Sequence, residues 1–425
     1  MKFITLLCNL LTTTIASTDF FNFRFALALS NSTGLSISWT SNNTYKFPPY
    51  IKYGLNPNNL NIAVQGYSKK YDISVHHHVT TKELKPNTKY FFKSGIDLYL
   101  SKTLSFMSPN NNYPLSIAVF GDMGVDNSEN TVKSLHSKDF DLFLHIGDIS
   151  YADDRGYQIG ENPEYEYIYD EFMSLISIFS KNAPYMVSPG NHDISCHSIY
   201  DIGCKQSFKN FTAYNSRFKM PSDESNGVEN LWYSYDFGPI HFVSINTESD
   251  FIGSPTDPKS FFFVPKAGGF GNQIKWLEND LYKANLNRDE RPWIIVVGHR
   301  PLYNQILFDW PLNSKSNIIK AFEDIFLKYN IDFYIAGHTH AYERNTKIVK
   351  GEINDLGIYH ITIGSPGCVE KLDERHLLQT KYNEFSNYKN YGFGELILHN
   401  KSTLEWKFHN VDDNTIDDSK IYNKV

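Results

Sequence analysis

The stretch that decides the fold is His145 to Asp154, HIGDISYADD. The apolar run at residues 142–146 predicts a buried strand, which the chain leaves by a turn at Gly147. Asp148 follows at once, and Tyr151 comes three residues later. In α/β domains, functional side chains collect beyond the carboxyl ends of the strands. The stretch therefore predicts a site that uses a carboxylate and a phenol together.

Four other segments repeat this pattern of an apolar run that ends in a polar loop: 115-LSIAVFGD-122, 185-YMVSPGNHD-193, 293-WIIVVGHR-300 and 331-IDFYIAGHTHAYER-344. Helical spacing separates several of them, as in residues 164–181 and 272–285. Strands that alternate with helices predict an α/β domain, which we place at residues 111–425. Residues 394–410 predict a hairpin near its end.

The first part of the chain has a different pattern. Residues 18–110 contain short runs of alternating apolar and polar positions without helical spacing, and they predict a β-sandwich. Trp39 is a candidate for its core. One segment resembles the tyrosine corner of fibronectin type III modules, with four residues at every second position: Leu84, Pro86, Thr88 and Tyr90.

Three consecutive histidines, His76, His77 and His78, lie in this β-sandwich region and could form a metal site. Adjacent residues of a strand point to opposite faces of the sheet. The pattern therefore favours a packing or solvated role over a shared metal ion.

Composition limits the function classes. The 425 residues carry a formal net charge of -7 and no run of like charge, so we expect no nucleic-acid partner, which would select a basic surface. Residues 1–17 have the layout of a secretory signal peptide, although a first strand of the mature fold is the alternative. No other segment approaches the roughly 20 apolar residues of a membrane span. We expect a secreted, lysosomal or vacuolar protein, monomeric or homodimeric.

Two further features concern export. Four asparagines fit the N-glycosylation pattern: Asn31, Asn42, Asn210 and Asn400. Removal of the signal would take Cys8 with it and leave three cysteines. A bridge between Cys196 and Cys204 would suit an exported protein, and two free thiols are the alternative. The role of Cys368 stays open.

The strand ends carry many potential metal ligands: Asp122, Asp148, Tyr151, Asn191, His192, His299, His338 and His340. Each of these residues alone is weak evidence for a metal site, but all of them follow the end of a strand. They are too many for one ion and suit two cations about 3.5–4 Å apart, as in phosphoryl-transfer sites. Asp148 is the candidate to bridge them. His338 and His340, two positions apart, could address one ion each.

The set GDxG, GDxxY, GNHD, VxxH and GHxH resembles the purple acid phosphatases, within the larger metallophosphoesterases. The resemblance covers nearly the whole mature chain, including 211-FTAYNSRFKMP-221 and 391-YGFGELILHN-400. It implies a fibronectin-like β-sandwich followed by a catalytic domain with an α/β/β/α arrangement. It also answers the question that Tyr151 raises, because in this family the tyrosine is a phenolate ligand to iron(III).

The resemblance and the chemistry of the donors agree on two metal sites. Hard anionic donors favour a trivalent ion, so the first site should hold Fe(III) with Asp122, Asp148, Tyr151 and His340. The second has less negative charge and suits Zn(II), Mn(II) or Fe(II), with these ligands: Asp148, Asn191, His299 and His338. A strongly acidic ion lowers the pKa of bound water, so a hydroxide nucleophile can persist in acid.

The implied reaction is in-line attack of that hydroxide on a phosphate monoester. We expect His192 to contact the phosphate or protonate the leaving group, with a hydrogen bond to the ligand shell as the alternative. Asp193 could orient His192, although the family usually has Glu there. Arg300 could pair with phosphate or form a structural salt bridge.

The expected substrates are small phosphorylated molecules. Two other functions stay possible: a phosphodiesterase or nucleotide pyrophosphatase on the same scaffold, and a catalytically idle binding protein that uses its β-sandwich. Plant-type relatives carry further histidines after the VxxH motif, whereas this chain has 300-RPLYNQILFDW-310 there. The substrate and the general acid are therefore not determined by the sequence.

Overall fold

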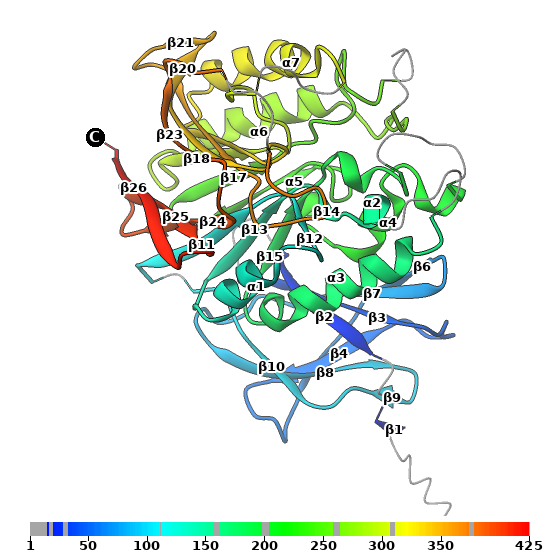
Figure 1. The fold of residues 1–425 in the computed structure, drawn as a ribbon. Helices are drawn as coiled ribbons and strands as arrows, with labels where there is room; N and C mark the ends of the chain where they lie inside the picture. Colours follow the sequence, from blue (N-terminus) through cyan, green and yellow to red (C-terminus); the bar gives the residue numbers. More distant parts are fainter. Residues whose placement is uncertain are drawn as a thin grey trace, which may run out of the picture.

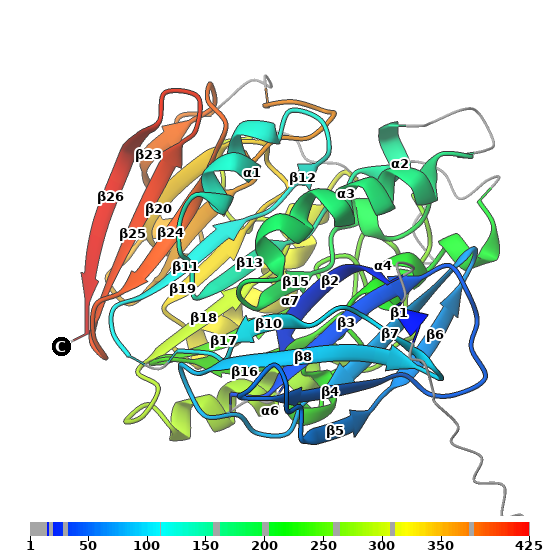
Figure 2. The ribbon, with the colours of Figure 1, turned by 90° about the horizontal axis from the view of Figure 1, so that it is seen from below.

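The computed structural model describes residues 15–16, 20–28, 33–110, 112–155, 162–197, 204–257, 264–306, 311–373 and 378–424. Two β-sheets form the amino-terminal part (Figures 1 and 2). One has the order β1-β9-β8-β4-β5, with β10 paired to β8: β1 Ile15–Ala16, β4 Tyr50–Gly54, β5 Ile62–Gln65, β8 Lys89–Ile96, β9 Tyr99–Leu100 and β10 Leu104–Met107. The other has the order β2-β3-β7-β6: β2 Phe21–Leu27, β3 Leu35–Ser41, β6 Tyr67–Tyr71 and β7 Ser74–Thr80.

The core between these sheets agrees with the sequence pattern. Trp39 is completely buried and packs against Phe20 and Phe23. The hydroxyl of Tyr90 accepts a hydrogen bond from the backbone N–H of Lys85 at 3.1 Å, which is the contact that defines a tyrosine corner. The predicted β-sandwich is therefore confirmed. Strand β1 belongs to the segment expected to be a signal peptide and pairs with β9.

Two larger sheets form the rest of the molecule. The first has the order β15-β13-β11-β24-β25-β26: β11 Leu115–Phe120, β13 Leu142–Ile146, β15 Tyr185–Ser188, β24 Gly392–Leu398, β25 Thr403–Asn410 and β26 Thr415–Asn423. The second has the order β16-β17-β18-β19-β22-β20-β21, with β23 on β20: β16 Tyr233–Phe237, β17 Ile240–Ser244, β18 Trp293–Val297, β19 Phe333–Ala336, β20 Tyr342–Val349, β21 Glu352–Ile353, β22 Ile358–Ile363 and β23 Asn383–Asn387. A short parallel pair, β12 Met123–Gly124 and β14 Ile149–Ser150, follows β11 and β13 of the first sheet in sequence.

Helices cover the outer faces of both sheets. Figure 1 shows α6 and α7 on one side and α1 and α3 on the other, which makes the four layers α/β/β/α. The bounds are α1 Glu129–His136, α2 Ala152–Arg155, α3 Tyr165–Ser180, α4 Thr212–Arg217, α5 Ser222–Ser225, α6 Gln273–Leu286 and α7 Ser314–Lys328. The predicted fold class is confirmed, and the helices expected at 164–181 and 272–285 lie within one residue of α3 and α6.

The β-sandwich packs against one side of α3 through β2, as Figure 2 shows. Helix α3 is buried on its inner side by residues at helical spacing, such as Ile168, Phe172 and Ile176. It is therefore covered on both sides, by a sheet of its own domain and by the β-sandwich. Among the described helices, none is both long and apolar enough to cross a membrane.

The cysteine alternatives are resolved. Cys196 and Cys204 form a disulfide across a sequence separation of 8. Cys368 is buried with a free thiol.

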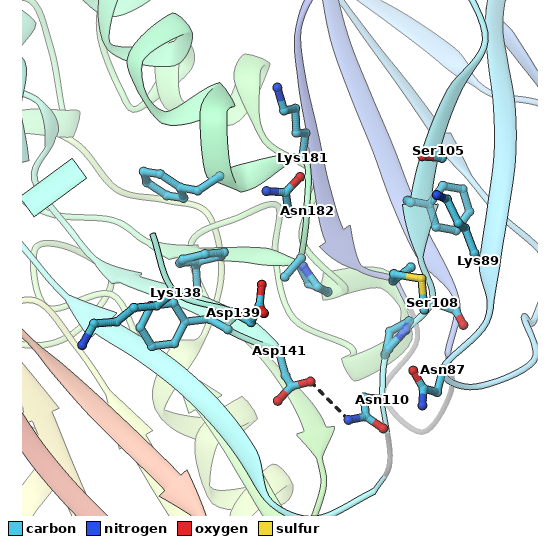
Figure 3. A pocket seen from close by; sticks show the side chains of 18 of the residues that line it. Asn87, Lys89, Ser105, Ser108, Asn110, Lys138, Asp139, Asp141, Lys181 and Asn182 are labelled. Carbon is cyan, nitrogen blue, oxygen red and sulfur yellow. Dashed lines mark hydrogen bonds between the residues drawn. The ribbon is translucent and has the colours of Figure 1, made fainter. Parts of the chain in front are cut away.

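A pocket lies between the β-sandwich and the amino-terminal ends of β13 and β15 (Figure 3). Asn110 reaches across it and donates a hydrogen bond to Asp141 at 3.3 Å. Its lining contains none of the predicted metal ligands, all of which the structure describes. This is expected, because those ligands follow the carboxyl ends of the strands, at the opposite edge of the sheet.

Candidate metal centre

Parallel pairing aligns the strand ends that carry the site. In one sheet β11, β13 and β15 run parallel, and in the other β17, β18, β19 and β22 run parallel. The two sheets meet where these strands end. There the backbone N–H of His338 donates to both carboxylate oxygens of Asp122, at 2.9 and 2.7 Å. The loops that were predicted to carry ligands therefore converge at one place.

The backbone at this place is strained. Four of the predicted ligands have positive φ angles: Asp122 at 60°, Asp148 at 55°, Tyr151 at 53° and His338 at 64°. Such conformations cost energy in residues other than glycine and persist at sites where the surrounding structure enforces them. Tight packing holds Asp148 in this conformation. A Cβ atom added to Gly190 would lie only 2.2 Å from Oδ1 of Asp148.

The first group of donors surrounds Tyr151. Its hydroxyl oxygen lies 2.8 Å from Nε2 of His340, 3.3 Å from Oδ1 of Asp122 and 3.5 Å from Oδ2 of Asp148. Tyr151 and both aspartates are almost completely buried. Burial and the nearby Cys368, Asp122 and Asp148 raise the pKa of Tyr151. A phenolate would therefore form here only beside a cation that compensates this negative charge.

The second group surrounds the other side of Asp148. Nε2 of His299 lies 2.9 Å from Oδ2 of Asp148 and 3.1 Å from Oδ1 of Asn191. One ligand atom each of Asp148, His299 and His338 lie within 4.8 Å of one another. The same oxygen of Asp148 thus contacts both Tyr151 and His299. Asp148 is therefore the carboxylate that joins the two groups.

The histidines are oriented to offer a lone pair. Nδ1 of His299 lies 3.1 Å from the carbonyl oxygen of Ile146, and Nδ1 of His340 lies 2.8 Å from that of Lys371. A carbonyl oxygen only accepts, so each Nδ1 carries a hydrogen, and Nε2 is the nitrogen that each ring would offer to a metal ion once it is neutral. This second contact is the usual arrangement of metal-binding histidines.

The electrostatics also suit a cation. Burial lowers the pKa of His299, but the carboxylates of Asp148 and Asp122 raise it to about 9. Burial raises the pKa of Asp148, but His299 and His192 lower it to a value below its ordinary range. The cluster thus attracts positive charge, and its imidazole, carboxylate, phenol and amide donors fit iron, zinc or manganese.

His192 lies beside this cluster. Its backbone N–H donates to Oδ1 of Asp148 at 2.8 Å, and its ring centre lies 4.3 Å from that of Tyr151. Nδ1 lies 2.8 Å from Oδ2 of Asp153. Nε2 faces the cluster, 3.9 Å from Oδ2 of Asp148 and 3.8 Å from Glu370. His192 is therefore held by one carboxylate and directs its other nitrogen at the candidate centre.

The expectation that Asp193 orients His192 needs correction, because Asp153 makes that contact. The buried carboxylate of Asp193 accepts three backbone N–H groups instead, from Gly190 at 2.8 Å, Asp148 at 3.1 Å and Ile149 at 3.3 Å. Asp193 thus ties the loop after β15 to the loop after β13. It supports Asp148 through the backbone.

Arg300 has contacts of both predicted kinds. Its Nε donates to the two oxygens of buried Glu248 at 2.9 and 3.0 Å, which is the structural salt bridge. Its Nη1 lies 2.8 Å from Nε2 of His338, and its Nη2 donates to Asn191 at 3.3 Å. One side of the guanidinium is thus anchored while the other faces the second donor group. Pairing with phosphate stays a prediction.

Sequence reasoning missed three residues of this site: Asp153, Glu248 and Glu370. Asp153 stands in the stretch first quoted, two positions after Tyr151, so its proximity could have been considered. Glu248 and Glu370 were given no role from the sequence, and the fold brings them to Arg300 and His192.

The glycosylation candidates differ in accessibility. Asn42 and Asn400 are exposed. Asn210 is half-buried, and its side-chain oxygen accepts from the N–H of Gly268 at 3.3 Å. Asn31 lies outside the described residues. Glycosylation at these positions stays a prediction.

Comparison with known proteins covers most of the chain. Residues 115–342 match the family model of calcineurin-like phosphoesterases, residues 22–108 match the purple acid phosphatase N-terminal domain, and residues 357–419 match the iron/zinc purple acid phosphatase-like protein C model. An acid phosphatase of Aspergillus ficuum is 30% identical, over 87% of this chain and 81% of its own. Acid phosphatase type 7 of Homo sapiens is 33% identical, over 76% and 71%.

A solved structure agrees in fold. The purple acid phosphatase PPD1 from yellow lupin seeds superposes with a TM-score of 0.76 and 22% identity, over 95% of this chain and 74% of its own. The family models cover both parts of the molecule, and the two relatives each align over more than two thirds of their length. On these grounds, the chain belongs to the purple acid phosphatases.

Proposed function

We propose that this chain is an acid phosphatase that hydrolyses small phosphate monoesters at a centre of two metal ions. The observation that carries the proposal is the position of Asp148, whose Oδ2 contacts Tyr151 on one side and His299 on the other. A carboxylate shared by two groups of nitrogen and oxygen donors is what a binuclear centre requires.

The two ions would be held by the donor groups described above. Fe(III) suits the group with the phenol, made of Asp122, Asp148, Tyr151 and His340. A divalent ion, Zn(II), Mn(II) or Fe(II), suits the group made of Asp148, Asn191, His299 and His338. When bound, the ions supply the Lewis acidity that activates water and neutralises charge on the phosphoryl group.

The protein's own residues would bind and orient the substrate. Nε2 of His192 faces the centre while Asp153 fixes its ring, so His192 can contact a phosphate oxygen or hold a proton for the leaving group. The side of the Arg300 guanidinium that contacts His338 and Asn191 faces the centre and can pair with phosphate, while Glu248 holds the other side. Asp193 holds the loop after β13 and the loop after β15 together through hydrogen bonds to their backbone N–H groups.

Export is part of the proposal. A signal at residues 1–17, the exposed sequons at Asn42 and Asn400 and the Cys196–Cys204 disulfide all suit an oxidising compartment. We propose that the protein is secreted or resides in a lysosome or vacuole, where an acidic reaction would be useful.

The test uses purified protein with p-nitrophenyl phosphate and bis(p-nitrophenyl) phosphate as matched monoester and diester. We expect acid hydrolysis of the monoester to dominate, and His299→Ala or Asp148→Ala to abolish turnover and lose one metal equivalent. The matched control is His399→Ala, because His399 is exposed and pairs with Glu405. Full activity in His299→Ala would refute the second site, and a preference for the diester would refute the substrate class.

A further inference from the structure

The three consecutive histidines of β7 are buried and face two different environments. His77 points into the β-sandwich, where its ring centre lies 5.3 Å from that of Trp39. Its two nitrogens lie 2.8 Å from the hydroxyls of Ser41 and Ser68. His76 and His78 point the other way because side chains alternate along a strand. These two histidines lie where the β-sandwich meets the α/β domain.

His78 forms a hydrogen bond between the two domains. Its Nε2 lies 3.0 Å from the carbonyl oxygen of Ser216, which can only accept, so Nε2 carries the hydrogen. Its Nδ1 lies 2.8 Å from the hydroxyl of Ser38 and accepts from it. His76 is bonded within its own domain, with Nδ1 3.2 Å from Thr40 and Nε2 3.0 Å from Ser74. In this network His78 is bonded as a neutral ring.

The same interface contains two buried arginines. Arg217 of α4 is completely buried and pairs with Glu166 at 2.9 Å and Asp170 at 3.4 Å, both on α3. Arg24 of β2 donates to the carbonyl oxygen of Arg217. Tyr71 of β6 donates to Glu166 at 2.7 Å. Glu166 therefore has partners from both domains, and Asp170 has its partner in α4.

Besides Glu166 and Asp170, the charged and titratable groups around His76 and His78 come from both domains. The β-sandwich contributes Arg24 on β2, Tyr67, Lys69 and Tyr71 on β6 and His77 on β7, and the α/β domain contributes Tyr165 and Tyr169 on α3 and Arg217 on α4. Burial lowers the pKa of His76 well below its ordinary value, and Arg217 and Arg24 lower it further. Burial and Arg24 do the same to His78. A proton on either ring would add a cation to a dry interface that already holds two.

We propose that the β-sandwich is docked on the α/β domain by a contact that holds while His76 and His78 are neutral and opens reversibly in acid. The direction of this pH dependence follows from the number of protons that each state binds. The undocked state, with hydrated histidines, binds more protons than the docked state, so docking weakens as pH falls below about 6.5. Protonated His78 would still donate to Ser216 through Nε2, and its Nδ1 would become a donor, to which the Ser38 hydroxyl would have to turn and accept.

Undocking would reach the metal centre through α3. Just before this helix, Nδ2 of Asn162 donates to the carbonyl oxygens of Ala152 at 2.9 Å, Asp153 at 3.2 Å and Cys196 at 3.1 Å. Asn162 thus ties the start of α3 to α2, which carries Asp153 and directly follows Tyr151. Loss of the β-sandwich from α3 would loosen this support, so undocking would set the acid limit of the activity proposed above.

The experiment is a pH titration of the full-length protein by small-angle X-ray scattering, with far-UV circular dichroism on the same samples. We expect the radius of gyration to rise in acid while the secondary structure remains, and to return after neutralisation. In His78→Gln, whose amide can replace both hydrogen bonds but cannot titrate, the transition should move to lower pH by about half a unit or more. His76→Gln is the second variant, in case one of them does not fold.

The matched control is His77→Gln. His77 is a buried histidine of the same strand, but its hydrogen bonds stay inside the β-sandwich, so its removal should leave the transition where it is in the wild type. An unchanged midpoint in both His76→Gln and His78→Gln would overturn the proposal. So would simultaneous loss of secondary structure, which would indicate global unfolding. None of these readouts uses catalysis, so they are independent of the proposed activity.

Discussion

The hydroxyl of Tyr151 lies 2.8 Å from Nε2 of His340, although 189 positions separate the two residues. Tyr151 follows β14, in the part of the chain that builds the first sheet, and His340 follows β19 of the second. Their contact therefore joins the two sheets at the edge where the parallel strands end. A tyrosine fixed beside a histidine and two carboxylates has little purpose in packing and suits a metal ligand.

This contact predicts the colour of the protein. The oxidised wild type should absorb visible light through a phenolate-to-iron(III) transition, and Tyr151→Phe should lose the band because it removes the phenol oxygen but keeps the ring. The measurement is the visible spectrum together with the iron content. A colourless wild type with two metal equivalents would exclude ferric iron beside Tyr151.

Replacement of the carboxylate behind His192 should impair catalysis while leaving the metals in place. Asp153 lies 2.8 Å from Nδ1 of His192 and touches none of the donor atoms of the two groups in the described contacts. Asp153→Asn should lower kcat about 10–100-fold, because carboxylates that orient site histidines have effects of this size. The control is Asp154→Asn, whose carboxylate is 3.8 Å from the same nitrogen and partly exposed. Equal kcat values for Asp153→Asn and the wild type would contradict this role.

The sequence indicated the ligand loops because each combines two local signals, an apolar strand and a polar turn. Those signals are sufficient to place Asp122, Asp148, Asn191 and His299 at one edge of the fold. They do not indicate in which direction the short turn after β15 aims its side chains. For that reason Asp193, which binds three backbone N–H groups, was assigned the contact that Asp153 makes.

Two further features left no signal in the sequence. Strand β26 lies at the edge of its sheet, and its run of mostly polar, partly exposed residues lacks the alternation that marked β24 and β25. The contact of Arg24 with Arg217 spans 193 positions, and nothing near either residue predicts that an arginine would be buried there. The position of β26 and the contact between the two arginines both depend on how the strands and helices pack once they have formed.

The disulfide should contribute to stability. Cys196 and Cys204 close a short loop, for which chain entropy gives a stabilisation of roughly 2–3 kcal/mol. The double change Cys196→Ser and Cys204→Ser should lower the free energy of unfolding by about that amount in a denaturant titration. A reducing agent should destabilise the wild type and leave the double variant unchanged. If the reductant affected both equally, the effect would come from elsewhere.

His241 should make stability fall at high pH. Its Nδ1 lies 2.7 Å from Asp236 on β16, and its Nε2 lies 3.0 Å from Asp280 on α6. Burial lowers its pKa, but the two carboxylates raise it to about 9. The folded state therefore holds a proton that the unfolded state releases near pH 6.5. The resulting stabilisation, about 3 kcal/mol, is complete below pH 6.5 and is lost as pH rises through about 9. His241→Gln should remove this part of the pH dependence of unfolding, whereas His399→Gln, at an exposed pair, should retain it. Parallel pH profiles for the wild type and His241→Gln would show that the two carboxylates do not hold a proton on His241.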